Sequence, residues 1–285
     1  MEMVIIYRAY QYEGDLNTYF GDTIDYYFGI GKNLYDNQKT KIEDSLKDFY
    51  LNEDTLNGRE MKDKWFPKIE ADVFLSHSHK DEKTIIALAG YLYEKFHIKS
   101  FIDSTVWGYA NDLLRLIDDE HCKPKGPANY NYDYNSRNYS TSHVHLMLNT
   151  ALLEVLDGTE CVIFVETPNS IQSVEETINK GTYSPWIYSE LNLINYLRIK
   201  TPKRLLDMYK GQFNTRDGEI VLSENWQIWH DVSTPLEALI PLHGNHLNAL
   251  AACRIHNKQE EKKLIAQENL DRLYKMVKRE KEIAK

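Results

Sequence analysis

The chain has 285 residues, of which 42% are hydrophobic and 27% charged, a composition typical of folded proteins that excludes wholesale disorder. Its formal net charge of −9 excludes a general attraction for phosphate backbones or anionic lipid, so we expect neither nucleic acid nor a membrane as a partner. No apolar run approaches the roughly 18 residues of a membrane span, and the first residues lack the pattern of a signal peptide. The scattered Cys122, Cys161 and Cys253 suit a reducing compartment, and we expect a cytoplasmic protein.

The first 67 residues carry only weak patterns. A short strand is predicted at 4–7, an aromatic stretch with glycines follows at 19–31, and apolar residues at helical spacing mark 41–50. The run Gly29-Ile30-Gly31-Lys32 lacks the glycine spacing and the following Ser or Thr of a phosphate-binding loop. We therefore interpret residues 1–67 as an N-terminal appendage of unknown role.

From residue 71 the pattern becomes clear. An apolar run at 72–75 predicts a strand, and it ends in the polar residues 76–79. Apolar residues at helical spacing then extend from Ile85 to Phe96, a second strand is predicted at 98–102, and a second helix at 111–119. This alternation of strand and helix is typical of a parallel α/β sheet.

Residues 121–140 interrupt that pattern with a stretch rich in Asn and Tyr, which predicts a long loop or insertion. A helix over about 144–155, a strand over 161–165 and a second long loop over 168–183 are expected next. Ser184 and Pro185 then give a strong helix start, because Ser caps a helix and Pro suits its first position. Weaker strand signals follow at 219–222 and 227–231, and an amphipathic helix is predicted from Lys258 onward.

Four short blocks, in order along the chain, resemble those of Toll/interleukin receptor (TIR) domains. Residues 72–81 resemble the first strand and the loop after it, and residues 100–103 resemble the second strand, which leads into the BB loop. Residues 161–165 resemble the third strand, and residues 184–191 resemble the Ser-x-Trp-x-x-x-Glu-Leu helix that follows it.

The resemblance implies a flavodoxin-like parallel α/β sheet with helices on both faces, in a TIR-like domain over about 68–232. The appendage at 1–67 would precede this domain, and a C-terminal helical extension at 233–285 would follow it. Such sheets bind ligands at the carboxyl ends of their strands, where residues 76–78, 103–107 and 167–169 would project. The loops at 121–140 and 168–183 are longer than a minimal TIR domain needs, and Ile187 stands where the family often has cysteine.

The same resemblance implies an activity. Many bacterial TIR domains cleave NAD, and the catalytic glutamate of their Trp-x-x-x-Glu helix corresponds to Glu190. Nicotinamide is bound to ribose as a cation and leaves as a neutral molecule, so this cleavage needs no general acid, unlike ordinary glycoside hydrolysis. One carboxylate is then enough to hold the ribose hydroxyls and to stabilise the charge that develops at the anomeric carbon. By spacing alone, Glu190 is more typical of a solvated glutamate on a helix whose Trp186 packs in the core, and it is the resemblance that favours catalysis.

Further substrate-binding residues follow from the resemblance. Ser76, His77 and Ser78 would border the nicotinamide end of the pocket, although a strand-to-helix turn also explains such serines. Asp103 would meet the ribose or adenine, or would cap the next turn, and Trp107 would stack on a base or form an assembly contact.

Trp186 lies one helical turn before Glu190 and completes the expected substrate-binding set. We expect no metal, because the pairs His77/His79 and His143/His145 have no evident third ligand. No cofactor is expected either, since NAD is the substrate.

The leading interpretation is a NAD glycohydrolase that releases nicotinamide and forms ADP-ribose or a cyclic ADP-ribose-type signal. The family context implies bacterial anti-phage defence, homo-oligomers formed through TIR contacts, and a downstream effector that senses the product. One alternative is a non-catalytic TIR scaffold, and another is an N-glycosidase, such as a deoxyribosyltransferase, acting on a different nucleoside.

Overall fold

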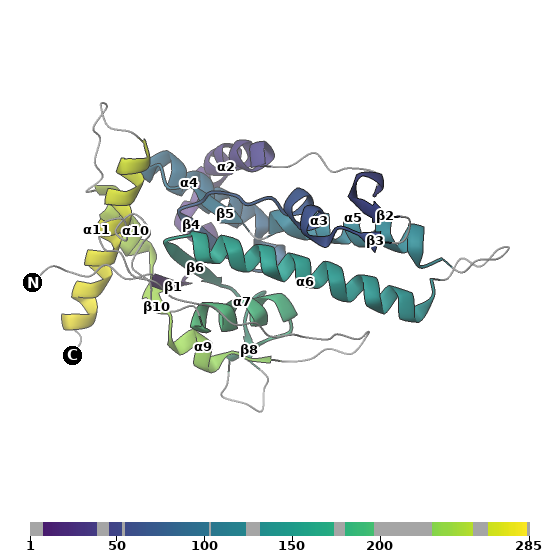
Figure 1. Ribbon diagram of the computed structural model, residues 1–285. Coiled ribbons are helices and arrows are strands. Elements are labelled where there is room, and N and C mark those ends of the chain that lie inside the picture. Colours follow the sequence, from purple (N-terminus) through teal and green to yellow (C-terminus); the bar gives the residue numbers. More distant parts are fainter. Residues whose placement is uncertain are drawn as a thin grey trace, which may run out of the picture. The chain divides into compact units, whose positions relative to one another are not determined.

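The chain divides into two structural units. The computed structural model describes residues 8–38, 46–52, 55–102, 104–123, 132–173, 180–196, 230–252 and 262–283 (Figure 1). The first unit comprises Met1–Asp36, Glu70–Ile102 and Leu156–Lys285, and the second comprises Asn37–Ile69 and Asp103–Val155.

A five-stranded sheet, in which every neighbouring pair of strands is parallel, forms the centre of the first unit (Figure 1). In spatial order its strands are β10 (Ile240–Leu242), β1 (Arg8–Glu13), β6 (Cys161–Glu166), β4 (Val73–Ser76) and β5 (Ser100–Ile102). Without β1, the strands β5-β4-β6 follow the 2-1-3 order at the start of a flavodoxin-like sheet, and β1, the first strand of the chain, lies between β6 and β10. The predicted fold class is therefore confirmed.

One face of this sheet carries the main hydrophobic core. Side chains alternate between the two faces along a strand, so Tyr10 and Tyr12 of β1 point to the same face, where both are almost fully buried. Tyr10 stacks against Tyr274, with 6.4 Å between ring centroids. The helices that contribute buried residues to this core are α1 (Leu16–Phe20), α2 (Ile24–Gln38), α4 (Glu82–Phe96), α10 (Gly244–Ala252) and α11 (Lys262–Ile283).

The opposite face of the sheet carries the side chains that alternate, along each strand, with those of the main core. Phe74 of β4 and Phe101 of β5 lie on this face, with ring centroids 5.2 Å apart, and Ser76 follows two residues after Phe74. Helix α7 (Pro185–Tyr196) packs here, because its Glu190 contacts Ser76. Helices therefore cover both faces, as the sequence predicts.

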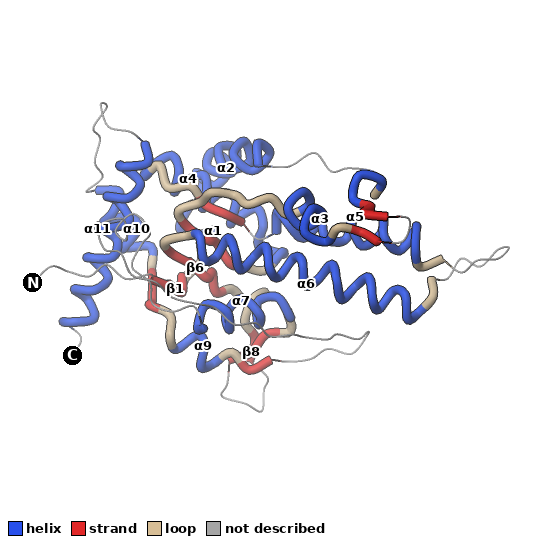
Figure 2. Tube along the Cα trace, in the orientation of Figure 1, coloured by secondary structure: helices blue, strands red, loops and turns tan. Residues whose placement is uncertain are grey.

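A small antiparallel sheet leads into helix α7. It consists of β7 (Gln172–Ser173), β8 (Lys180–Thr182) and β9 (His230–Asp231), with β8 in the middle (Figure 2). Short helix α9 (Ser233–Glu237) follows β9. Part of the loop expected at 168–183 therefore forms strands β7 and β8. Of the strand expected at 227–231, only residues 230 and 231 are described, and they form β9, since 197–229 lie outside the described residues.

The second unit is built mainly from helices. Its elements are the 3-10 turn η2 (Lys47–Phe49), the hairpin strands β2 (Tyr50–Asn52) and β3 (Thr55–Leu56), and helices α3 (Gly58–Trp65), α5 (Ser104–His121) and α6 (Tyr134–Gly158), the last of which ends in the first unit. Buried Asp118 of α5 accepts a hydrogen bond from Ser140 of α6 and pairs with Arg137 at 3.3 Å. Burial raises the pKa of the adjacent Cys122 thiol, which therefore stays protonated at neutral pH.

The N-terminal segment is not an appendage. Strand β1 lies inside the central sheet, paired with β6 on one side and β10 on the other, and the strand predicted at 4–7 falls outside the described residues. Strand β10 from the C-terminal region then forms the sheet edge. A domain at 68–232 would hold only three of the five strands, so those boundaries are wrong, because distant segments complete one sheet.

Two segments that were expected to be loops are helical. Residues 134–139 of the predicted insertion form the first turns of α6, and residues 104–107, expected in a BB-like loop, begin α5. Neither stretch has an apolar period of its own, and each is the first part of a longer helix whose later turns bury apolar residues, such as Leu113 of α5 and Leu148 of α6. By contrast, the predicted C-terminal helix is confirmed as α11, with Ala266, Leu270 and Leu273 buried.

Helices α2 and α4 cross so closely that glycine is required at their contact. A Cβ atom on Gly31 would lie 1.9 Å from the Ile86 carbonyl oxygen, and one on Gly90 would lie 2.0 Å from the Tyr27 carbonyl oxygen. Gly29, in the same helix as Gly31, has nothing within 4 Å of such an atom.

We expect Gly31→Ala to lower the free energy of unfolding by about 1–3 kcal/mol, because the helices must separate. Gly29→Ala should instead raise it by about 0.5–1 kcal/mol, since alanine favours the helix at an open position. Urea denaturation of the two variants measures both changes. If both substitutions changed the free energy of unfolding by the same amount, the close crossing of α2 and α4 would be contradicted.

Candidate functional site

Two predicted site residues, distant in sequence, meet on the second face of the sheet. Ser76 is the last residue of β4, and its Oγ donates a hydrogen bond of 2.6 Å to Oε2 of Glu190 on α7. Both side chains are buried, with exposed fractions of 0% and 2%. A buried carboxylate is costly unless it accepts such hydrogen bonds, so the pair is an ordered polar site in an otherwise apolar layer.

Local sequence explains why Glu190 reaches this place. The Ser184 Oγ accepts a hydrogen bond from the Ile187 backbone N–H at 3.3 Å and caps α7, and Pro185 occupies the first helical position, as predicted. Ile187 and Leu191 are buried on the same helix. Because Glu190 lies three residues after Ile187 and one before Leu191, it shares their inward-facing side and cannot remain in solvent.

The residues after β4 continue the polar site. His77 is buried with an exposed fraction of 3%, and its ring lies 6.5 Å from that of His79. Ser78 is half-buried at the start of the 3-10 turn η3 (His79–Asp81), which leads directly into α4. Ser76, His77 and Ser78 therefore lie at the carboxyl end of β4, as expected, and Ser76 donates a hydrogen bond to Glu190.

The other predicted residues are less closely defined. Trp186 is half-buried in the first turn of α7, one turn before Glu190. Asp103 lies outside the described residues. Trp107 belongs to α5 in the second unit, and its side chain is not among those described. Among the side chains that the structure describes, no three His, Cys, Asp or Glu groups converge as a metal site.

A pocket of about 830 Å³ opens beside the carboxyl ends of β1 and β6. Neither Ser76 nor Glu190 lines it. Its wall comes from the loop after β1, the start of α4, the loop after β6 and strand β8, through Glu13, Gly14, Asp15, Leu16, Asn17, Asp81, Thr84, Ile85, Val165, Glu166, Thr167, Pro168, Asn169, Ile171 and Lys180.

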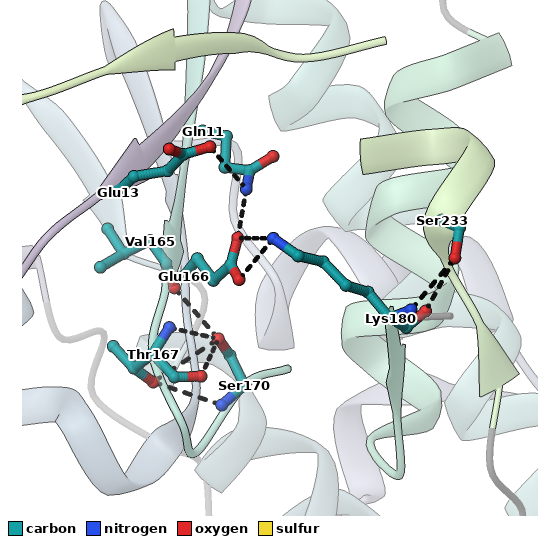
Figure 3. Close-up of polar contacts among 8 residues, drawn as sticks. All are labelled: Gln11, Glu13, Val165, Glu166, Thr167, Ser170, Lys180 and Ser233. Carbon is teal, nitrogen blue, oxygen red and sulfur yellow. Dashed lines mark hydrogen bonds and ion pairs between the residues drawn. The ribbon is translucent and has the colours of Figure 1, made fainter. Parts of the chain in front are cut away.

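A network of polar contacts forms one wall of this pocket (Figure 3). The buried Gln11 amide donates to Glu13 at 3.2 Å and to Glu166, joining β1 to β6. The Lys180 Nζ lies 2.8 and 2.9 Å from the two carboxylate oxygens of Glu166, and the Lys180 backbone N–H donates to Ser233. The network thus ties β8, the strand that precedes α7, to the central sheet.

Most residues of this pocket were not predicted from the sequence. Of its lining residues, only Thr167 to Asn169 were expected at the carboxyl ends of the strands. Tyr10 and Tyr12 alternate with polar Gln11 and Glu13. This period of two is typical of a strand and by itself predicts β1. Because the predicted strand ends at residue 7, Glu13 and Asp15 were not expected at the carboxyl end of a strand.

Comparison of the chain with protein-family models, with curated proteins and with solved structures finds no significant match. In the part of the chain that the structure describes, no helix combines the length and apolar character needed to cross a membrane.

Proposed function

We propose that the protein is a TIR-type NAD glycohydrolase that cleaves the bond between nicotinamide and ribose. The observation that supports this most is the buried hydrogen bond between Ser76 and Glu190, at the carboxyl end of a central strand. Flavodoxin-like sheets bind their ligands at this edge. A glutamate held near this edge, in the segment that resembles the TIR catalytic helix, has the chemistry that the proposed reaction needs.

In the proposed reaction, the bond between the anomeric carbon and the nicotinamide nitrogen breaks, and its electron pair stays on that nitrogen. Nicotinamide leaves as a neutral molecule, and positive charge develops on the ribosyl carbon and ring oxygen. The Glu190 carboxylate stabilises this charge and holds the ribose hydroxyls. Capture by water gives ADP-ribose and a proton, whereas capture by the adenine base gives a cyclic product.

Ser76 would act as a positioning residue. Its hydrogen bond restrains Oε2 of Glu190, which keeps the carboxylate in one orientation before the substrate arrives. Glu190 is 2% exposed, so NAD reaches it only after a local opening beside α7. We therefore expect turnover to depend on a conformational step, such as the assembly of several copies or the arrival of an activator.

The biological setting belongs to the same proposal. Release of nicotinamide with a cyclic or linear ADP-ribose product suits a bacterial defence protein in the cytoplasm that depletes NAD or signals to an effector. Homo-oligomers formed through TIR-type contacts would then provide the opening step.

Purified protein at high concentration is expected to release nicotinamide from NAD, as followed by chromatography of the products. Ser76→Ala should lower kcat by about tenfold with little change in KM, because it loosens Glu190 without removing it. A wild-type protein that assembles yet releases no nicotinamide would favour a non-catalytic scaffold. Release of a base from other nucleosides, but not from NAD, would favour a different N-glycosidase.

A further inference from the structure

The pocket at the ends of β1 and β6 has the size and place of a small-molecule site. Its volume of about 830 Å³ lies within the range of roughly 300–1,000 Å³ that is common for such sites. It opens at the carboxyl edge of the parallel sheet, where α/β folds bind ligands. Ser76 and Glu190 are not among its described lining residues.

The charge of the lining excludes anionic ligands. Among the described lining residues there are four carboxylates, Glu13, Asp15, Asp81 and Glu166, and one ammonium group, Lys180, which gives this part of the wall a formal charge of −3. The two contacts between Lys180 and Glu166 already use that ammonium group. A phosphate or carboxylate ligand would therefore face three further negative charges, whereas a cation would be attracted.

The wall of the pocket is also partly apolar. Its described carboxylates come from different segments of the chain, and apolar Leu16, Ile85 and Val165 line the same pocket. Separated negative charges with apolar surface between them fit a ligand whose positive groups are spaced along a hydrocarbon chain.

We propose that this pocket binds a linear aliphatic polyamine, whose ammonium groups pair with the carboxylates while its methylene groups contact the apolar wall. The proposal does not depend on NAD cleavage.

Two of the carboxylates are held in place before any ligand binds. Asp81 accepts hydrogen bonds from the Thr167 hydroxyl at 2.6 Å and from the Asn169 amide at 2.7 Å. Asp15 accepts from the Thr18 hydroxyl and the Asn17 backbone, and these hydrogen bonds lower its pKa, so it is ionised at neutral pH. Preorganised acceptors of this kind reduce the entropy that a flexible ligand loses on binding.

Isothermal titration of the full chain with spermidine at low salt is expected to show saturable binding of one molecule. Glu13→Gln should weaken binding about two- to fivefold, and the double variant Glu13→Gln, Asp81→Asn should weaken it about tenfold. Each substitution removes one solvent-accessible ion pair between the protein and the ligand. Glu13 is exposed at the end of β1, so its substitution leaves the fold intact. Hexane-1,6-diol, which has the chain but no charge, should not bind.

The matched control is Glu94→Gln, which removes one exposed carboxylate from α4 outside the pocket. It should leave the affinity for spermidine unchanged. If Glu94→Gln weakens binding as much as Glu13→Gln does, spermidine binds the acidic surface in general and the proposal is overturned. Wild-type affinity in the double variant, or no saturable binding to the wild type, overturns it as well.

Discussion

Glu190→Gln is expected to lower nicotinamide release by about 100- to 1000-fold while leaving the fold intact. Glutamine has the shape of glutamate but no negative charge, so it cannot stabilise the positive ribosyl group that forms as nicotinamide leaves. Loss of one preorganised electrostatic partner costs this much in comparable sites. The loss should appear in kcat and in kcat/KM alike, because the interaction is made in the transition state.

The isosteric change also limits structural damage. The Ser76 hydroxyl can still donate to the amide oxygen at position 190, so the buried pair keeps one hydrogen bond. Single-turnover assays with NAD measure the rate, and thermal unfolding reports whether α7 remains packed. Glu94→Gln again serves as the control, since it removes a carboxylate from the surface of the same unit. Nicotinamide release by Glu190→Gln at the wild-type rate would rule out Glu190 as the catalytic residue.

Tyr10→Ala is expected to lower the free energy of unfolding by about 3–5 kcal/mol, the usual cost of removing a large aromatic ring from a core. Tyr10 is fully buried, stacks on Tyr274 of α11, and lies at the middle of β1, opposite Ile163 of β6 and Ile240 of β10. Its removal leaves a cavity where segments from both ends of the chain meet.

The control for Tyr10→Ala is Tyr26→Ala, because the Tyr26 side chain is 59% exposed on α2. Its substitution should change the free energy of unfolding by no more than about 0.5 kcal/mol. Denaturation in urea, followed by tryptophan fluorescence, compares the two variants on one scale. If the N-terminal segment were an appendage, neither tyrosine would matter to the unfolding of the sheet, and the two variants would behave alike.

The local parts of the fold were predictable from sequence for a physical reason. Strand β6 is a continuous apolar run because a central parallel strand is buried on both faces. The start of α7 follows from Ser184 and Pro185, whose capping and backbone preferences act over a few residues. The buried stripe of α11 follows from its period of three to four.

The candidate site was predictable in part. The resemblance of residues 184–191 to one helix and of residues 72–81 to one strand pointed to Glu190 and Ser76 separately, and a parallel sheet places both near one edge. Their hydrogen bond depends on the way that α7 packs on the second face. No pattern within either segment specifies that contact, because the two residues are 114 positions apart.

By itself, the sequence of this protein predicted a parallel α/β sheet, several of its helices and strands, and Glu190 as a candidate site residue through a family resemblance. Only the tertiary structure decided that β1 and β10, from opposite ends of the chain, complete the sheet beside β6. It also decided that Glu13, Asp81, Glu166 and Lys180 line one pocket. Propensity and periodicity act between near neighbours, whereas strand order and pocket walls arise from burial of apolar surface among segments far apart in the chain.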